Sequence, residues 1–182
     1  EAEKDDDKVL EIELQAVEIK RLSENYQYKD YEYIINDIIA RAKKKNNSQI
    51  LCITYKEIGN NFFEVEPEKA LDFYKRALVE NKKVKDSLFE ANINGNIGLL
   101  YSEKLHQYKL SRKYTSLAYD YFSKHKLNYN LAVNYVNKAA LFLQEKKLDS
   151  AIVMYKKAEA LDIKDNNINT RVGLYELMSE AY

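Results

Sequence analysis

Apolar residues recur at intervals of three and four along most of this chain, and polar breaks divide the pattern into segments of helical length. The clearest pair of segments spans 132–161, AVNYVNKAALFLQEKKLDSAIVMYKKAEAL, with a polar break at 144–147. Its second run places one stripe of residues on a single helix face: Leu148, Ala151, Ile152, Tyr155, Ala158 and Leu161. Small residues allow two helix backbones to approach closely, and large ones fill the gaps between them. The pattern predicts two packed helices joined by a short turn.

Helical spacing in the rest of the chain predicts an all-α protein of about nine helices. Four glycines and one proline leave few signals for turns or β-hairpins, which favours the same class. Asp30 and Ser48 are expected to cap the second and third helices, and Pro67 to lie in the first turn of the fourth. The helices are expected at 9–25, 31–45, from Ser48, from Pro67, at 86–104, at 108–124, twice within 131–161, and after 167.

A small residue recurs at equivalent positions, with intervals of 39, 41 and 40 residues between Gly59, Gly98, Ala139 and Ser179. Around these positions the large and small residues alternate, at Tyr135, Ala139, Phe142, Leu148, Ala151, Tyr155 and Ala158, and again at Ala70, Tyr74 and Ala77. This alternation resembles the tetratricopeptide repeat (TPR), a helix–turn–helix unit of ~34 residues. The resemblance covers 48–182 and implies a right-handed superhelical solenoid of antiparallel helix pairs with a period near 40. Lys138 departs from the pattern, because the family usually has an aliphatic residue there.

The segments divide the chain into three parts. Residues 1–8 are too charged to bury and are either a remnant of expression or a frayed end. Residues 9–47 form a degenerate first helix pair or an N-terminal cap. The TPR array follows at 48–182, with units at about 48–85, 86–128 and 129–166 and a half unit at 167–182. The last helix has an apolar face and no following helix, which favours a natural protein that continues beyond Tyr182 over one covered by a second copy.

Composition and motifs argue against catalysis, cofactor or metal binding, nucleic-acid binding and membrane insertion. Lysine plus arginine equal aspartate plus glutamate at 29 each, so the net charge gives no case for nucleic acid or an anionic membrane. No apolar run reaches the ~18 residues that span a bilayer. Cys52 is expected in the core, and His106 and His125 on the surface. With no catalytic, metal-binding or phosphate-binding motif, we expect no enzyme activity, metal or cofactor. The tyrosines at packing positions are assigned to the core: Tyr55, Tyr74, Tyr101, Tyr114, Tyr135 and Tyr155.

The TPR resemblance implies a concave groove, lined by the first helix of each unit, for a protein or peptide. The groove-facing positions are Ile53, Lys56, Asn60 and Phe63, then Asn92, Asn96 and Leu99, then Val133, Asn137 and Ala140. TPR co-chaperones grip a C-terminal carboxylate from such positions, and Lys56, Asn60 and Asn96 match three of theirs. Val133 and Asn137 stand where those proteins have basic residues, so the clamp is partial.

The period near 40 and the segments ANINGNIGLLY and PEKALDFYKRAL resemble TPR arrays of bacterial signalling and transcription regulators. In these proteins the array precedes a DNA-binding or histidine-kinase region, neither of which lies in this chain. The resemblance implies a non-catalytic sensory or regulatory interaction module. The sequence assigns no compartment, and a cytoplasmic location is favoured over an extracytoplasmic one. The alternatives are a free-standing scaffold that self-associates through its terminal helices, or an adaptor that binds C-terminal peptides through the partial clamp.

Overall fold

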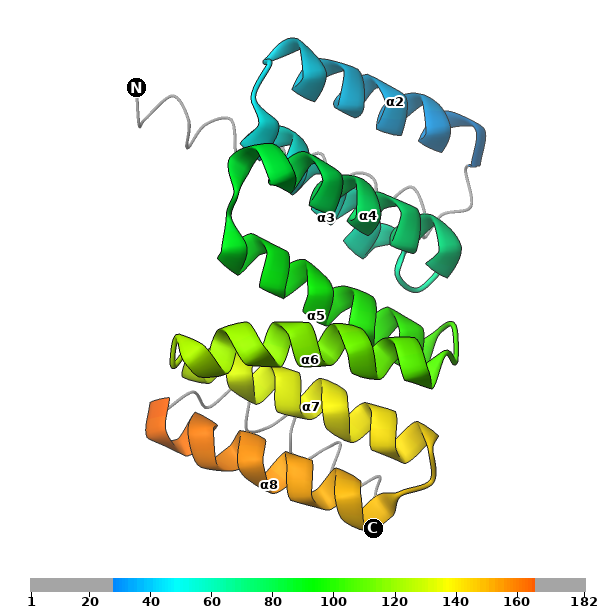
Figure 1. The fold of residues 1–182 in the computed structure, drawn as a ribbon. Coiled ribbons are helices and arrows are strands. Elements are labelled where there is room, and N and C mark those ends of the chain that lie inside the picture. The colour runs from blue at the N-terminus through cyan, green and yellow to red at the C-terminus, as the bar shows by residue number, and fades with distance from the viewer. Residues whose placement is uncertain (1–27, 166–182) are drawn as a thin grey trace. The chain divides into compact units, whose positions relative to one another are not determined.

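The computed structural model describes residues 28–165, and every regular element in this range is an α-helix. The all-α prediction is therefore confirmed for these residues. The expected helices at 9–25 and after 167 lie outside them, as does Ser179. The seven helices are α2 (Tyr28–Lys44), α3 (Ser48–Phe62), α4 (Pro67–Val84), α5 (Ser87–Glu103), α6 (Tyr108–Lys124), α7 (Asn128–Gln144) and α8 (Leu148–Asp165) (Figure 1).

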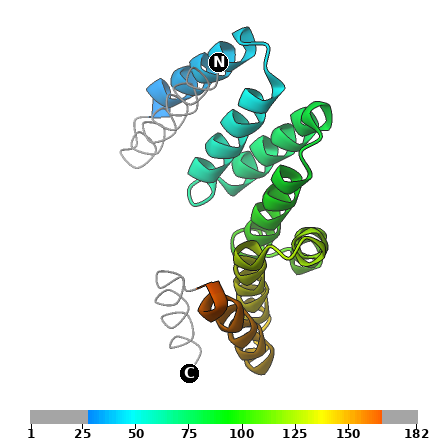
Figure 2. The same cartoon turned by 90° about the vertical axis from the view of Figure 1, so that its left-hand side faces the viewer.

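The chain divides into two compact units, residues 1–86 and 87–182. In the first unit α3 packs along α4, and α2 contacts α3. In the second unit α5 packs along α6 and α7 along α8, while α7 also contacts both α5 and α6. Two views at right angles show α7 and α8 side by side as a hairpin (Figure 1, Figure 2). Consecutive helices joined by short turns thus form the close pairs that the small and large residues predict.

Small residues lie where the paired helices approach most closely. Ala70 and Ala77 of α4 are fully buried, and a Cβ added to Gly59 of α3 would lie 2.7 Å from the Tyr74 ring. In the second unit, Tyr155 fills the space between four buried alanines: Ala132, Ala139, Ala151 and Ala158. The alternation seen in the sequence therefore reflects helix packing.

Helix starts differ from the expectation at two of three positions. Pro67 begins α4, as predicted. The helix α2 already begins at Tyr28, so Asp30 lies within its first turn and does not cap it. Asn47 caps α3, because its Oδ1 accepts hydrogen bonds from the backbone N–H groups of Gln49 and Ile50. The Ser48 hydroxyl instead donates to Glu80 Oε1 of α4 at 2.7 Å, and this tertiary contact removes it from the capping role.

The described turns end helices without glycine. Five non-glycine residues adopt positive φ after a helix: Asn46, Lys85, His106, Lys126 and Lys146, with φ between 47° and 61°. The left-handed conformation costs roughly 1–2 kcal/mol for a residue with a Cβ. The chain thus makes these turns between helices without using any of its four glycines in the left-handed conformation.

Candidate functional site

The predicted groove positions of the first unit lie on α3 and are occupied by their own contacts. Lys56 forms an ion pair with Glu57. Asn60 donates from Nδ2 to Glu57 Oε2 at 3.0 Å, and its Oδ1 accepts from the Tyr74 hydroxyl at 2.9 Å. Ile53 is half-buried, as is Phe63, which lies just beyond the end of the helix. Glu57 supplies a carboxylate to both clamp residues, so a ligand carboxylate would meet like charge here.

In the second unit, the predicted positions lie on α5 and α7. The side chains of Asn92, Asn96, Leu99 and Ala140 are half-buried, Val133 is exposed, and Asn137 is buried at 9% exposure. An amide pair joins the two helices, because Asn130 Nδ2 donates to Asn92 Oδ1 at 2.9 Å. These positions carry no charge, so the structure brings no basic group to the predicted carboxylate position.

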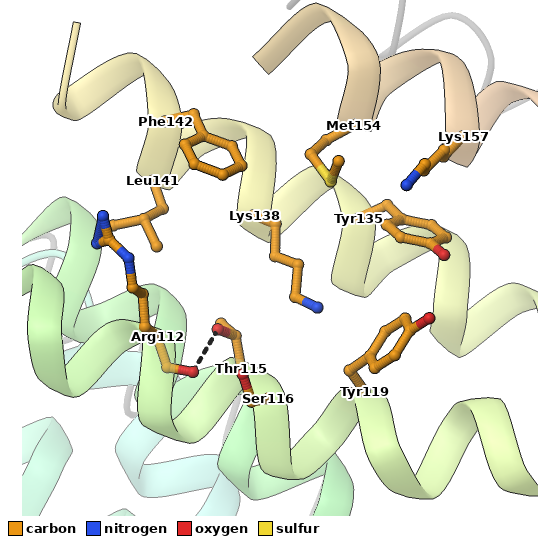
Figure 3. A pocket seen from close by; sticks show the side chains of 10 residues that line it. All are labelled: Arg112, Thr115, Ser116, Tyr119, Tyr135, Lys138, Leu141, Phe142, Met154 and Lys157. Carbon is orange, nitrogen blue, oxygen red and sulfur yellow. Dashed lines mark hydrogen bonds between the residues drawn. The ribbon is translucent and has the colours of Figure 1, made fainter. Parts of the chain in front are cut away.

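A pocket of about 430 Å³ lies elsewhere in the second unit, between α6, α7 and α8 (Figure 3). On α7 it is lined by Tyr135, Lys138 and Phe142, which are spaced as one helix stripe. At 100° per residue this stripe lies opposite the groove stripe of Val133, Asn137 and Ala140. The remaining lining residues are Leu141 of α7, Arg112, Thr115, Ser116 and Tyr119 of α6, and Met154 and Lys157 of α8.

Positive charge dominates this pocket, and none of the described residues that line it is Asp or Glu. Arg112 is paired with Glu145. Within the described part of the chain, Lys138 and Lys157 form no ion pair. The Lys138 Nζ atom lies 3.8 Å from the centroid of the Tyr119 ring, and Lys157 Nζ lies 5.7 Å from that of Tyr135. Burial lowers the pKa of Lys138, although the charge of nearby Asp120 opposes this effect.

Two tyrosines form the wall beside these ammonium groups. The rings of Tyr119 and Tyr135 lie 5.8 Å apart, tilted by 60°, and Figure 3 shows both hydroxyl groups on the same side. Hydrogen bonding from Tyr135 lowers the pKa of Tyr119, and the two ammonium groups add to this effect. Burial, and then the interaction with Tyr119, raise the pKa of Tyr135 to about 12. These interactions favour the negatively charged form of the Tyr119 hydroxyl.

The variant Tyr135→Phe is expected to raise the pKa of Tyr119, because the phenolate of Tyr119 loses its hydrogen bond. A ¹³C NMR titration of ring-labelled tyrosine measures this, with the signal assigned through Tyr119→Phe. Tyr129→Phe, on an exposed residue of the same helix, is the control and should leave the signal unchanged. An unchanged or lower pKa of Tyr119 in Tyr135→Phe would contradict the arrangement.

A second pocket, of about 290 Å³, lies in the first unit between α2, α3 and α4. Lys69 and Arg76 lie over the stacked rings of Phe62 and Phe73. Its cations are neutralised, since Arg76 pairs with Asp72 at 2.7 Å and Lys69 pairs with the carboxylate of Glu66 at 2.7 Å. Lysines that form no ion pair with the described residues thus distinguish the pocket of the second unit from this one.

Sequence reasoning missed the larger pocket. Of the tyrosines assigned to packing positions, Tyr55, Tyr74, Tyr101 and Tyr155 are buried as expected. Tyr135 and Tyr114 are half-buried, with Tyr135 packed against the core cluster of α7 and α8 and Tyr114 stacked on Tyr101. The available signal was Lys138, a cation at a position where the resembling family has an aliphatic residue.

Other candidate groups were tested within the described residues. No cluster of three or more His, Cys, Asp or Glu side chains in this range could hold a metal ion. None of the described helices combines the length and apolarity that a membrane crossing requires. His106 and His125 are exposed. Cys52 is buried, with its thiol against the carbonyl oxygen of Ala77 at 3.7 Å, and burial raises its pKa to about 11, which makes it a poor nucleophile.

Comparison with known proteins finds no family model and no curated protein that matches this chain. Among solved structures, the chain is similar to the crystal structure of BtubC (BKLC) from P. vanneervenii. The TM-score is 0.71 at 19% sequence identity over 84% of this chain, which spans 63% of the length of that structure. At this identity the likeness shows an all-helical fold alone. Membership of the TPR family stays a prediction.

Proposed function

We propose that the chain is a non-catalytic protein-interaction module, built from TPR-like helix pairs that stack as a right-handed solenoid. In the second unit, its ligand is an extended peptide segment bound along the first helices α5 and α7. The close pairs α5–α6 and α7–α8, with small residues at their contacts, support the repeat architecture. As the resemblance to regulator arrays suggests, the module serves as the sensory or regulatory part of a bacterial signalling or transcription-regulatory protein.

One observation carries the binding proposal, the amide pair between Asn92 and Asn130. Their mutual hydrogen bond uses Asn92 Oδ1 and Asn130 Nδ2. The other two amide atoms, Asn92 Nδ2 and Asn130 Oδ1, have no partner among the described residues, and both side chains are only half-buried. One donor and one acceptor side by side match the N–H and C=O groups of a peptide backbone. Exposed Val133, one helical turn along from Asn130, offers apolar contact for a peptide side chain.

Peptides selected from a random library on the purified chain test this proposal. The double variant Asn92→Ala and Asn130→Ala should weaken binding of the selected peptides by roughly tenfold or more, because two backbone hydrogen bonds are lost. Asn36→Ala, on an exposed asparagine of α2, is the control and should leave affinity unchanged. The proposal would be contradicted if the double variant bound the peptides as tightly as Asn36→Ala does. It would also be contradicted if N-methylation of each peptide backbone amide left the affinity unchanged.

The geometry does not support the carboxylate-clamp alternative, because the Glu57 carboxylate already pairs with Lys56 and accepts a hydrogen bond from Asn60. A self-associating scaffold depends on the terminal helices, which lie outside the described residues. We therefore retain peptide recognition along α5 and α7 as the proposed function.

A further inference from the structure

We propose that the pocket between α6, α7 and α8 is a second binding site, and that it receives a Glu or Asp side chain of a peptide segment together with a neighbouring apolar side chain. The site lies on the face of α7 opposite the stripe of Val133, Asn137 and Ala140. It therefore stands or fails independently of the groove along α5 and α7.

The charge of the pocket identifies an anionic ligand. Lys138 is half-buried and Lys157 is exposed at the rim, and neither forms an ion pair within the described residues. A partly desolvated ammonium group is costly unless a carboxylate or a set of acceptors compensates it. Within this pocket the ammonium groups meet only tyrosine ring faces, and Asp120 acts on Lys138 only through its longer-range charge. An incoming carboxylate would supply the missing partner, with charge-assisted hydrogen bonds from both lysines.

The shape and the apolar wall identify a peptide side chain. Leu141, Phe142 and Met154 line the pocket beside the charged groups. A volume of about 430 Å³ lies near the lower end of the ~300–1,000 Å³ typical of small-molecule pockets. This space suits one or two side chains, and the open rim lets a chain continue past them.

Nucleic acid fits the pocket poorly. Phosphate-backbone binding relies on a row of cations that neutralise successive phosphates. Here two lysines lie over neighbouring tyrosine rings, and the third cation, Arg112, is already held by Glu145, so the pocket offers no such row. An acidic residue with an apolar neighbour is therefore the ligand that this arrangement favours.

The methionine methyl groups allow a direct test on the whole chain. The protein has two methionines, and Met154 lines the pocket. A ¹³C-methyl-methionine NMR spectrum therefore contains two signals, which Met154→Leu assigns. The probe is the peptide acetyl-Phe-Glu-Leu-amide, with acetyl-Phe-Gln-Leu-amide and free acetate as comparisons. We expect the glutamate peptide to shift the Met154 signal at millimolar concentration, with roughly tenfold weaker binding of the glutamine peptide.

Matched lysine variants locate the charge that is responsible. Lys157→Gln should weaken binding of the glutamate peptide by roughly tenfold, whereas Lys156→Gln, the exposed neighbour outside the pocket, should not. Lys138→Met should abolish the preference for glutamate over glutamine while keeping or raising the melting temperature, because an apolar chain replaces a partly desolvated charge.

Four outcomes would overturn the proposal. The Met154 signal could stay unmoved by the glutamate peptide, or the two peptides could bind equally. Losses of equal size in Lys156→Gln and Lys157→Gln would assign the effect to general surface charge. Binding of free acetate as tight as that of the peptide would assign the pocket to a small anion. Lys157→Gln still tests the proposal if Lys138→Met fails to fold, because Lys157 is exposed and its replacement should leave the fold intact.

Discussion

Replacing Tyr155 with alanine is expected to lower the free energy of unfolding by about 3–5 kcal/mol, the range for truncating a large buried aromatic side chain. Tyr155 is fully buried and belongs to one core cluster with Ala132, Ala139, Ala151 and Ala158. Alanine side chains cannot extend into the cavity, so the space is filled only as far as larger side chains packed against the cluster, such as Phe142 and Met154, can move. The loss is a large part of the ~5–15 kcal/mol that holds a typical domain folded.

Urea unfolding followed by circular dichroism measures this loss, and Tyr129→Ala provides the matched control. Tyr129 lies on α7 in the same unit but is 56% exposed, so its truncation should change stability by less than about 0.5 kcal/mol. Coincident unfolding midpoints for Tyr155→Ala and Tyr129→Ala would show that the α7–α8 hairpin does not pack as described.

The variants Gly98→Ala and Gly95→Ala, three residues apart on α5, are expected to have opposite effects on stability. A Cβ at Gly98 would lie 2.6 Å from Thr115 Cγ2 and 3.0 Å from the backbone N of Thr115 on α6. The Thr115 side chain cannot turn away without losing the hydrogen bond that its hydroxyl donates to the Ser111 carbonyl oxygen at 2.9 Å. The helices must therefore separate, at a cost of about 1–3 kcal/mol.

Gly95 offers space that Gly98 lacks. The nearest atom to its added Cβ is the Cβ of Ala118 at 3.9 Å, an ordinary contact. Gly95→Ala should then gain up to about 1 kcal/mol, since alanine is a better helix former than glycine. The same gain only partly offsets the clash at Gly98. Thermal unfolding of both variants tests the pair, and stabilisation by Gly98→Ala would refute the close approach of α5 and α6.

The two faces of α7 illustrate how one helix could serve two ligands. Val133 and Asn137 lie on one face, and Tyr135 and Lys138 on the other. The first face carries amides and apolar groups, and the second carries uncompensated positive charge. Because the two sets share no residue, the asparagine variants and the lysine variants separate the two proposals.

Local pattern alone was sufficient for the helices and their pairing in the described residues. Spacing of three and four identified α6 at its observed bounds, and Pro67 marked the start of α4. The alternation at Ala151, Tyr155 and Ala158 predicted a buried stripe, because small residues beside a large one are the packing requirement of two close helices. These features depend on neighbours within one or two helical turns, so the sequence contains them directly.

Tertiary structure alone decided the features that depend on distant residues. Ser48 is the first residue of α3 behind the Asn47 cap, and its hydroxyl donates to Glu80, 32 positions along the chain. The turns close through Lys85 or His106 in a left-handed conformation that local preference disfavours. The pocket arises because Tyr119, Lys138 and Lys157 come from three helices, and no spacing along the chain records their meeting. The sequence determined which residues form and pair the helices. The tertiary structure determined which charges in residues 28–165 find an ionic partner within that range, since compensation of a charge depends on what packing brings beside it.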